Sequence, residues 1–211
     1  MENEKNFVLS AFDLGKKFNR DWIFRNLNLD FRPGQRYAFV GRNGSGKSTL
    51  LQVLSGSVPL SEGKINYQST DGQDIEIDSW YKYIVIAAPY LELIEEFTPV
   101  ELLAFHNGFK SFKNSISTAQ IIGSLDLDLS KNKAIKYFSS GMKQRLKLAL
   151  AFYSDVPIVM LDEPTSNLDA YWTAWYLSEV QKLSASQIVL IASNVPNEYS
   201  FCEKIFSLSD Y

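Results

Sequence analysis

The sequence has very few residues of the types that build disulfide frameworks or histidine-based sites. Its 211 residues include one cysteine, Cys202, and one histidine, His106. A single cysteine excludes a disulfide within the chain, favours the cytosol as the compartment, and is expected to be a buried apolar thiol. A Ser/His/Asp triad or a histidine-based metal site would depend on His106 alone, and this residue follows the apolar helical stretch ELLAF. We therefore expect His106 to be an ordinary surface or half-buried side chain.

Long apolar runs and an excess of positive charge are also missing. No apolar segment approaches the roughly 18 residues that span a bilayer, and the N-terminal MENEKNF is polar and acidic rather than signal-like. The 21 lysines and arginines are outnumbered by 24 aspartates and glutamates, which gives a net charge of −3. Because nucleic-acid binding requires a concentrated cationic surface, the composition argues against such a partner. A hydrophobic content of 45% is ample for the core of one domain, or of one domain with two lobes.

The pattern of a phosphate-binding loop, GxxxxGK[ST], is present at residues 41–49, GRNGSGKST. The β-prone run RYAFV precedes it and the helical spacing of STLLQVLSG follows it, so the loop lies where a strand turns into a helix. Glycines allow backbone N–H groups to point inward, and a helix that begins at Lys47 adds its positive dipole end. The sequence therefore predicts a nucleoside triphosphate site, with a glycine turn beside a helix start as the alternative. The residues expected to hold the nucleotide are Gly41, Asn43, Gly44, Ser45, Gly46, Lys47, Ser48 and Thr49, with Lys47 on the β- and γ-phosphates and Ser48 on Mg²⁺.

A second motif, PIVMLDEP, places two acids at the carboxyl end of a short apolar strand, where open α/β sheets bind their ligands. Asp162 is expected to hold Mg²⁺ through water. Glu163 is expected to orient or deprotonate the water that attacks the γ-phosphate. The alternative is that both acids only cap the following helix.

The order of strands and helices predicts an α/β fold, with a parallel core sheet, an N-terminal antiparallel β lobe, and a helical lobe inserted at about residues 92–150. Residues 6–41 indicate three strands separated by turns at 15–20 and 33–34, and a hairpin around Asp71-Gly72 is expected to join INYQS to IEID. YKYIVIAAP, PIVMLDE and QIVLIAS indicate buried strands, and helical spacing dominates 98–151. The whole chain, 1–211, is predicted to be one domain.

The segment FSSGMKQR, residues 138–145, distinguishes this sequence from other phosphate-loop proteins. It resembles the signature motif of ABC-type ATPases, and GRNGSGKST, FSSGMKQR, VMLDEPTSNLD and the closing IVLIASNVPNEYSFCEKIFSL follow the order and spacing of that family. The resemblance covers nearly the whole chain and implies that Ser139 and Gly141, at a helix N-terminus, contact the nucleotide of a partner subunit. The alternative is that Ser139 or Ser140 only caps its own helix. Lys143, Arg145 and Lys147 are interpreted as a solvated helix face.

Two further positions match the family. SNLD, residues 166–169, resembles the D-loop, in which Asp169 helps to align the two halves of the dimer. Phe18, 23 residues before Gly41, is at the position of an aromatic residue that stacks on adenine, with a plain core phenylalanine as the alternative. The aromatic stripe Tyr171, Trp172, Trp175 and Tyr176 is interpreted as core rather than interface.

Two family residues are absent on the γ-phosphate side. Residues 74–119 contain no glutamine, although the Q-loop would have one near Ala88 or Pro89. Asn194 follows QIVLIAS at the position of the switch histidine. An asparagine donates hydrogen bonds to phosphate oxygens but carries no positive charge and relays no proton. We therefore predict ATP binding, with Asn194 still a catalytic candidate, and turnover that is low for the family.

The resemblance implies an ATP-binding, ATP-hydrolysing subunit that uses ATP and Mg²⁺ and is nearest to small export-type subunits. Its expected partners are a second ATPase subunit, in a homodimer or heterodimer with ATP at the interface, and an integral-membrane transporter subunit. Its expected location is cytoplasmic, peripheral on the inner face of the cell membrane. The alternatives are a nucleotide-gated dimerising module with weak or no hydrolysis, and a soluble ABC protein not tied to transport. A coupling surface for the membrane partner is expected at Tyr90, Leu91, Leu93, Ile94 and Phe97, unless these residues pack within the helical lobe.

Overall fold

The structure is a computed structural model that describes residues 7–69 and 72–208. It contains two compact units. The first comprises Met1–Ile84, Pro157–Glu163 and Ser184–Tyr211, and the second comprises Val85–Val156 and Pro164–Leu183. The second unit contains the helical insertion expected at about residues 92–150. Within the described residues, no helix is long and apolar enough to cross a membrane.

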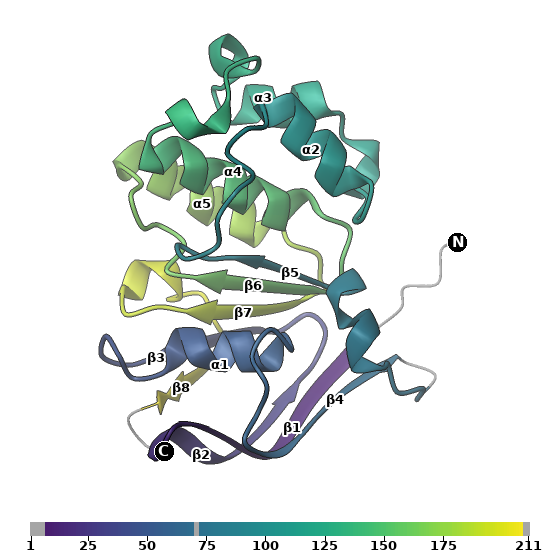
Figure 1. The fold of residues 1–211 in the computed structure, drawn as a ribbon, viewed down its shortest axis with the longest axis vertical. Helices are drawn as coiled ribbons and strands as arrows, with labels where there is room; N and C mark the ends of the chain where they lie inside the picture. Colours follow the sequence, from purple (N-terminus) through teal and green to yellow (C-terminus); the bar gives the residue numbers. More distant parts are fainter. Residues whose placement is uncertain (1–6, 70–71, 209–211) are drawn as a thin grey trace. The chain divides into compact units, whose positions relative to one another are not determined.

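The N-terminal part of the first unit is a three-stranded antiparallel sheet with the order β2-β1-β4 (Figure 1). β1 (Phe7–Phe18) pairs with both β2 (Asp21–Phe31) and β4 (Glu62–Ser69). The antiparallel lobe is confirmed, but the turn expected at Gly15 to Arg20 is shorter than predicted. β1 continues to Phe18 because shifts in register around Lys16 absorb the irregularity and keep the strand paired.

The core sheet has five strands in the order β5-β6-β7-β3-β8. Its strands are β3 (Arg36–Val40), β5 (Ile84–Ala87), β6 (Ile158–Asp162), β7 (Ile188–Ala192) and β8 (Lys204–Ser207). β6 and β7 are buried along their whole length, as expected for parallel strands covered on both faces. α1 (Lys47–Leu54) packs against both of them. The parallel core is confirmed. β8 is an additional strand: its four residues KIFS, two exposed and two partly buried, are too short a run to indicate a strand from sequence.

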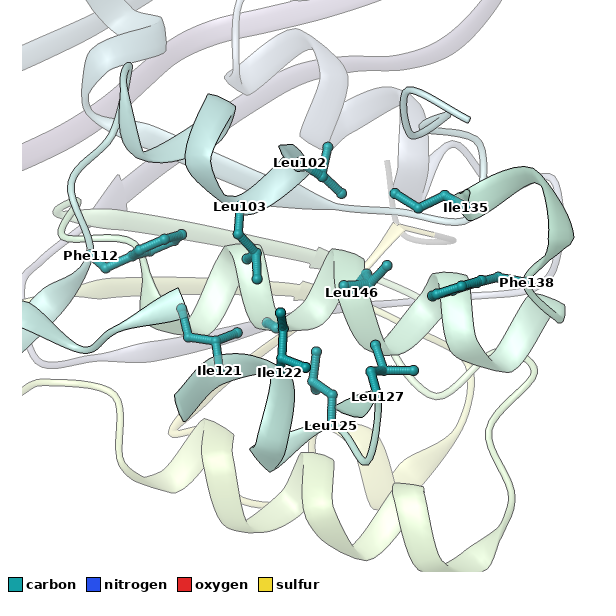
Figure 2. Packing of buried hydrophobic residues seen from close by; sticks show 11 residues of the cluster. Leu102, Leu103, Phe112, Ile121, Ile122, Leu125, Leu127, Ile135, Phe138 and Leu146 are labelled. Carbon is teal, nitrogen blue, oxygen red and sulfur yellow. The ribbon is translucent and has the colours of Figure 1, made fainter. Parts of the chain in front are cut away.

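The second unit is built from four α-helices around one apolar cluster (Figure 2). α2 (Pro99–Asn107) and α3 (Thr118–Ser124) each begin with a capping box, Thr98 with Glu101 and Ser117 with Gln120. α4 (Ser140–Tyr153) supplies the buried Leu146 and Ala149 to the cluster. α5 (Ala170–Gln181) is the fourth helix of this unit. The described residues also form 3₁₀ turns, at Ile77–Lys82 and Pro196–Glu198 in the first unit and at Lys113–Ser115, Asp128–Ser130 and Ile135–Tyr137 in the second.

The hairpin predicted to join INYQS to IEID forms only in part. Asp71, part of the turn expected from the sequence, lies outside the described residues. Tyr67 and Ile75 still share a backbone hydrogen bond of 2.8 Å, but Ile77–Lys82 is a 3₁₀ helix and not a strand. The reason is Trp80, which is buried and stacks on Tyr67 with ring centroids 4.1 Å apart. Burial of this indole outweighs strand pairing of its neighbours.

The basic residues of α4 do not form the solvated face that was expected. Lys143 forms an ion pair with Glu95, and Arg145 donates to the carbonyl oxygen of Leu125 at 2.6 Å. Lys147 donates to the carbonyl oxygens of Ala88 and Pro89 at 3.1 and 2.9 Å. The three side chains tie α4 to loops of its own unit, because long cationic side chains can satisfy backbone carbonyls that no helix or sheet pairs.

The single cysteine and the single histidine have the structural states expected of them. Cys202 is buried, and burial raises the pKa of its thiol to about 12. His106 is half-buried, and its Nε2 lies 2.7 Å from the hydroxyl oxygen of Ser154. Burial lowers its pKa to about 4, and the charge of Lys110 adds to the effect. A neutral, hydrogen-bonded imidazole of this kind has a structural role.

Candidate phosphate site

The loop between β3 and α1 has the backbone conformation that phosphate binding requires. β3 ends at Val40 and α1 begins at Lys47, as predicted. Gly44 and Gly46 have φ angles of 82° and 95°, in the left-handed region that favours glycine. A Cβ on Gly46 would also collide with the side chain of Ile23 in β2. The sequence pattern does not signal this second reason for a glycine at position 46.

Lys47 is 4% exposed and is held inside the loop. Its ammonium donates to the carbonyl oxygens of Gly41 and Arg42, at 2.9 and 3.1 Å. An ammonium has three N–H donors, so one remains for an oxygen of a bound phosphate. The Ser45 hydroxyl, in the same loop, is buried with no hydrogen-bond partner among the described residues. Both groups suit a loop that binds an anion with several oxygens.

Asp162, the last residue of β6, is 1% exposed, and neither carboxylate oxygen has a hydrogen-bond partner within the part of the chain that the structure describes. Burial raises its pKa to about 6. The negative charges of Glu163 and Glu198 add to this rise, whereas the Ser48 hydroxyl and the Lys47 charge lower the pKa. Such an unpaired buried carboxylate is costly unless a cation neutralises it. With the Ser48 hydroxyl close by, the donor set consists of hard oxygens and fits Mg²⁺.

Asp162→Asn is expected to stabilise the nucleotide-free, Mg²⁺-free protein by up to about 3 kcal/mol at pH 7.5. The Asp162 pKa is higher in the folded chain (about 6) than the ordinary value of 3.8, so the folded state bears the cost of ionisation once the pH exceeds both values. The free energy of unfolding should fall as the pH rises from about 4 to about 6. The variant should not show this fall, because asparagine does not ionise. Urea unfolding at pH 4.5 and pH 7.5 measures it; a variant less stable than wild type at pH 7.5 would contradict the prediction.

Glu163 follows β6 directly and has a left-handed φ of 42°. Its N–H donates to the carbonyl oxygen of Ala192, the last residue of β7, at 2.9 Å. A non-glycine residue in this region costs on the order of 1 kcal/mol or more, and such strain is concentrated at functional sites. The hydrogen bond fixes the backbone of Glu163 at the carboxyl edge of the sheet, where the sequence places it. Glu163 does not cap a helix, because the next described helix, α5, is capped by Asp169.

Asn194 lies beside the phosphate loop. Its Nδ2 donates to the Oδ1 of Asn43 at 2.8 Å, across 151 residues of sequence. The preceding residue, Ser193, donates its N–H to the carbonyl oxygen of Phe39 in β3 at 3.1 Å, which holds this segment against the strand that leads into the loop. The structure therefore brings together Asn43 and Asn194, two predicted site residues. The remaining loop residues, Gly41, Ser48 and Thr49, are in the same strand-loop-helix segment.

One buried acid next to the site has no clear signal in the sequence. Glu198 is buried and hydrogen-bonded to the hydroxyl of Ser193, which is fully buried. The Ser193 oxygen also accepts from the Val195 N–H at 2.9 Å. These contacts fix both flanks of Asn194. Only a serine followed five residues later by a glutamate is visible in the sequence, and such a spacing is too common to identify a buried pair.

Phe18 is exposed at the end of β1, with 48% of its surface accessible, so the alternative of a core phenylalanine is wrong. In the β1–β2 register Phe18 is opposite Asp21, two residues before Ile23. Ile23 in turn packs against Gly46 of the phosphate loop. An accessible ring therefore lies in the same sheet as the strand that touches the loop.

The signature segment and the SNLD loop lie together in the second unit. Ser139 is the N-cap of α4, and its Oγ accepts from the Met142 N–H at 3.2 Å. A Cβ on Gly141 would lie 2.9 Å from the carbonyl oxygen of Asn167, so this close approach needs a glycine. Asp169 caps α5 by accepting from the Trp172 N–H at 2.9 Å. Ser139 thus caps its own helix, which was the alternative to a role in nucleotide binding. Its hydroxyl hydrogen can still be donated to a phosphate.

The sequence model of the ABC transporter family matches residues 24–166, more than half of the chain. The chain is 26% identical to the uncharacterized ABC transporter ATP-binding protein YybJ of Bacillus subtilis over 199 residues, which cover 93% of this chain and 90% of YybJ. It is 30% identical to the arabinose import ATP-binding protein AraG of Pectobacterium atrosepticum over 210 residues, covering 96% of this chain and 40% of AraG. The dimeric structure of the ABC transporter cassette MJ0796 has the same fold, with a TM-score of 0.77 at 22% identity, over 94% of this chain and 93% of that one.

Proposed function

The chain belongs to the ABC transporter family as an ATP-binding subunit, and from this premise we propose that it binds ATP with Mg²⁺, hydrolyses the ATP and thereby drives a separate membrane subunit. The observation that carries the proposal is the grouping of Lys47, inside its loop, with the unpaired Asp162 carboxylate and the Asn43–Asn194 hydrogen bond. Similarity to transporter ATP-binding proteins favours this function over a dimerising module with weak or no hydrolysis and over an ABC protein not tied to transport.

Each residue has a separate role in the proposed reaction. Lys47 binds the β- and γ-phosphates, and the loop N–H groups and the Ser45 hydroxyl bind further oxygens. Ser48 and Asp162 would hold Mg²⁺, which neutralises charge on the phosphates when bound. Glu163 accepts the proton of the attacking water, and Asn194 donates a hydrogen bond to a γ-phosphate oxygen. Phe18 stacks on the adenine.

The proposed assembly is a dimer with ATP at its interface. Ser139 and Gly141 of one subunit would contact the nucleotide held by the other, because the N-terminus of α4 presents a hydroxyl, backbone N–H groups and a positive dipole end. The dimer of MJ0796, which has the same fold, supports this arrangement by analogy. Such a dimer would be peripheral on the cytoplasmic face of a membrane, bound to its transporter subunit. The narrower resemblance to small export-type subunits stays a prediction about the direction of transport.

The proposed contact with the membrane subunit is smaller than the five residues expected from the sequence. Tyr90, Leu91 and Ile94 are exposed. Leu93 and Phe97 instead pack against the apolar cluster of the second unit. Packing within the helical unit therefore accounts for Leu93 and Phe97, and the coupling surface stays a proposal for the three exposed residues. The exposed residues Tyr90, Leu91 and Ile94 stay as candidates for docking a short helix of the partner.

Release of phosphate from ATP by the purified protein, with Mg²⁺ and with EDTA, tests the proposed function. We expect release that depends on both Mg²⁺ and protein concentration, because the complete site needs two subunits. ATP binding without release, at concentrations at which the protein is dimeric, would contradict hydrolysis and support the dimerising module.

Asn194→His is expected to raise ATP turnover by about tenfold or more, since removing one positioned donor at such a site costs on the order of a hundredfold. An imidazole supplies charge and a proton relay that the amide lacks. Steady-state ATPase rates check this. The substitution also removes the hydrogen bond to Asn43, so Asn194→Ala is the matched control.

The absent glutamine can be restored at position 89, where the Pro89 side chain is exposed, rather than at the fully buried Ala88. An unchanged rate in both Asn194→His and its combination with Pro89→Gln would show that Asn194 already does the work of the histidine.

A further inference from the structure

The first unit contains a buried lysine that the proposed reaction does not use. Lys16, in β1, is 7% exposed, although lysine is rarely buried without a partner. Its ammonium donates to the carbonyl oxygen of Pro59 at 2.8 Å. Among the described residues it has no ion pair with a carboxylate. A neutral side chain of similar length would avoid the cost of burying this charge.

The other neighbour of the Lys16 ammonium is Phe18, whose ring centroid lies 4.6 Å from the nitrogen. This distance is within the range of a cation–π interaction. The hydrogen bond to Pro59 ties the ammonium to the loop that follows α1 and holds the cation beside the ring. Because 48% of the Phe18 surface remains accessible, the ring can still offer a face to a ligand.

We propose that Lys16 is a positioning residue for nucleotide recognition, which orients Phe18 as a stacking surface for the purine base. The proposal rests on the proposed function, in that Phe18 must contact the base. A ring that is already ordered loses less side-chain entropy when the base stacks on it. A cation on one face also draws electron density from the ring, which favours stacking of an electron-rich purine on the other face. Lys16 is itself almost inaccessible and therefore acts on the base only through Phe18.

Lys16→Met tests this role, because methionine keeps the length and apolar stem of lysine and removes the charge and the hydrogen bond. Binding of ATP and of inorganic tripolyphosphate, both with Mg²⁺, is measured by calorimetry. We expect the Kd for ATP to rise about threefold to tenfold, the size of effect expected when one further side chain must be ordered on binding. The Kd for tripolyphosphate, which has no base, should not change. The thermal midpoint should be unchanged or higher, whereas a lysine with only a structural role would lower it when replaced.

The matched control is Lys17→Met, at the next residue of the same strand. Lys17 is exposed, and its ammonium lies 5.1 Å from the ring centroid of Trp22 rather than near Phe18. This variant removes the same charge and should bind ATP as wild type does. Lys16→Met in a Phe18→Leu background should have no further effect on ATP binding, because the two residues act through one contact.

The binding data for the two variants distinguish the role of Lys16 from the adenine contact of Phe18 and from the phosphate site. Equal weakening of ATP and tripolyphosphate binding by Lys16→Met would show that the lysine acts through charge or fold, and would overturn the inference. Normal ATP binding by Lys16→Met, with weaker binding by Phe18→Leu, would overturn the role of Lys16 and leave Phe18 as the stacking residue. Normal ATP binding by Phe18→Leu would overturn the adenine contact itself, while the phosphate site would stand on the tripolyphosphate data.

Discussion

Lys47→Ala is expected to weaken ATP binding by about a hundredfold or more, because truncating one partner of a close, desolvated charge pair costs on the order of 2–5 kcal/mol. The ammonium is held by two carbonyl oxygens of the loop itself, so it is positioned before any phosphate arrives. Preorganisation of this kind means that little of the binding energy is spent on ordering the side chain. Calorimetric titration with ATP and Mg²⁺ measures the effect.

Arg42→Ala is the matched control for Lys47→Ala. Arg42 is in the same loop and carries the same charge, but its side chain is exposed. The control should lose only the modest, salt-dependent attraction of a surface charge. Thermal unfolding of both variants shows whether the loop still folds. If Lys47→Ala, folded, bound ATP as tightly as the control, the loop would not be the nucleotide site.

Glu163→Gln is expected to slow ATP hydrolysis by about a hundredfold or more and to leave ATP binding in place, since a general base contributes roughly 10²–10⁴-fold. Glutamine has nearly the same size and preserves the backbone hydrogen bond to Ala192, so the strained conformation at position 163 can be kept. With the nucleotide intact, Ser139 and Gly141 of each subunit would keep their contact with the partner's ATP. The variant should therefore accumulate as an ATP-bound dimer, which light scattering with and without ATP detects.

The control for Glu163→Gln is Glu76→Gln, which removes the charge of an exposed acid in the same unit and should change neither rate nor oligomeric state. A Glu163→Gln protein that binds ATP but stays monomeric at high protein and ATP concentrations would contradict the dimer model or the role of the signature segment. Undiminished phosphate release would contradict the assignment of Glu163 as the base.

The parts of the site that the sequence predicts are those specified by consecutive residues. GRNGSGKST between a β-prone run and a helical run predicts both the loop and the start of α1 at Lys47. The four apolar residues before Asp162 predict a buried strand that ends at the acids. In both cases local propensity and hydrophobic periodicity agree with the fold, so a short window of sequence contains the information.

The sequence by itself thus determined the α/β fold, the phosphate loop, the acidic strand end and the family. The tertiary structure alone decided the contacts between distant segments, such as Asn43 with Asn194 and Ile23 with Gly46. It also decided which charged residues are buried, including Lys16 and Glu198, against the usual preference of such residues for water. Local sequence patterns do not predict these contacts, because the energy of a buried polar group depends on partners that other elements supply. The sequence alone does not place those partners.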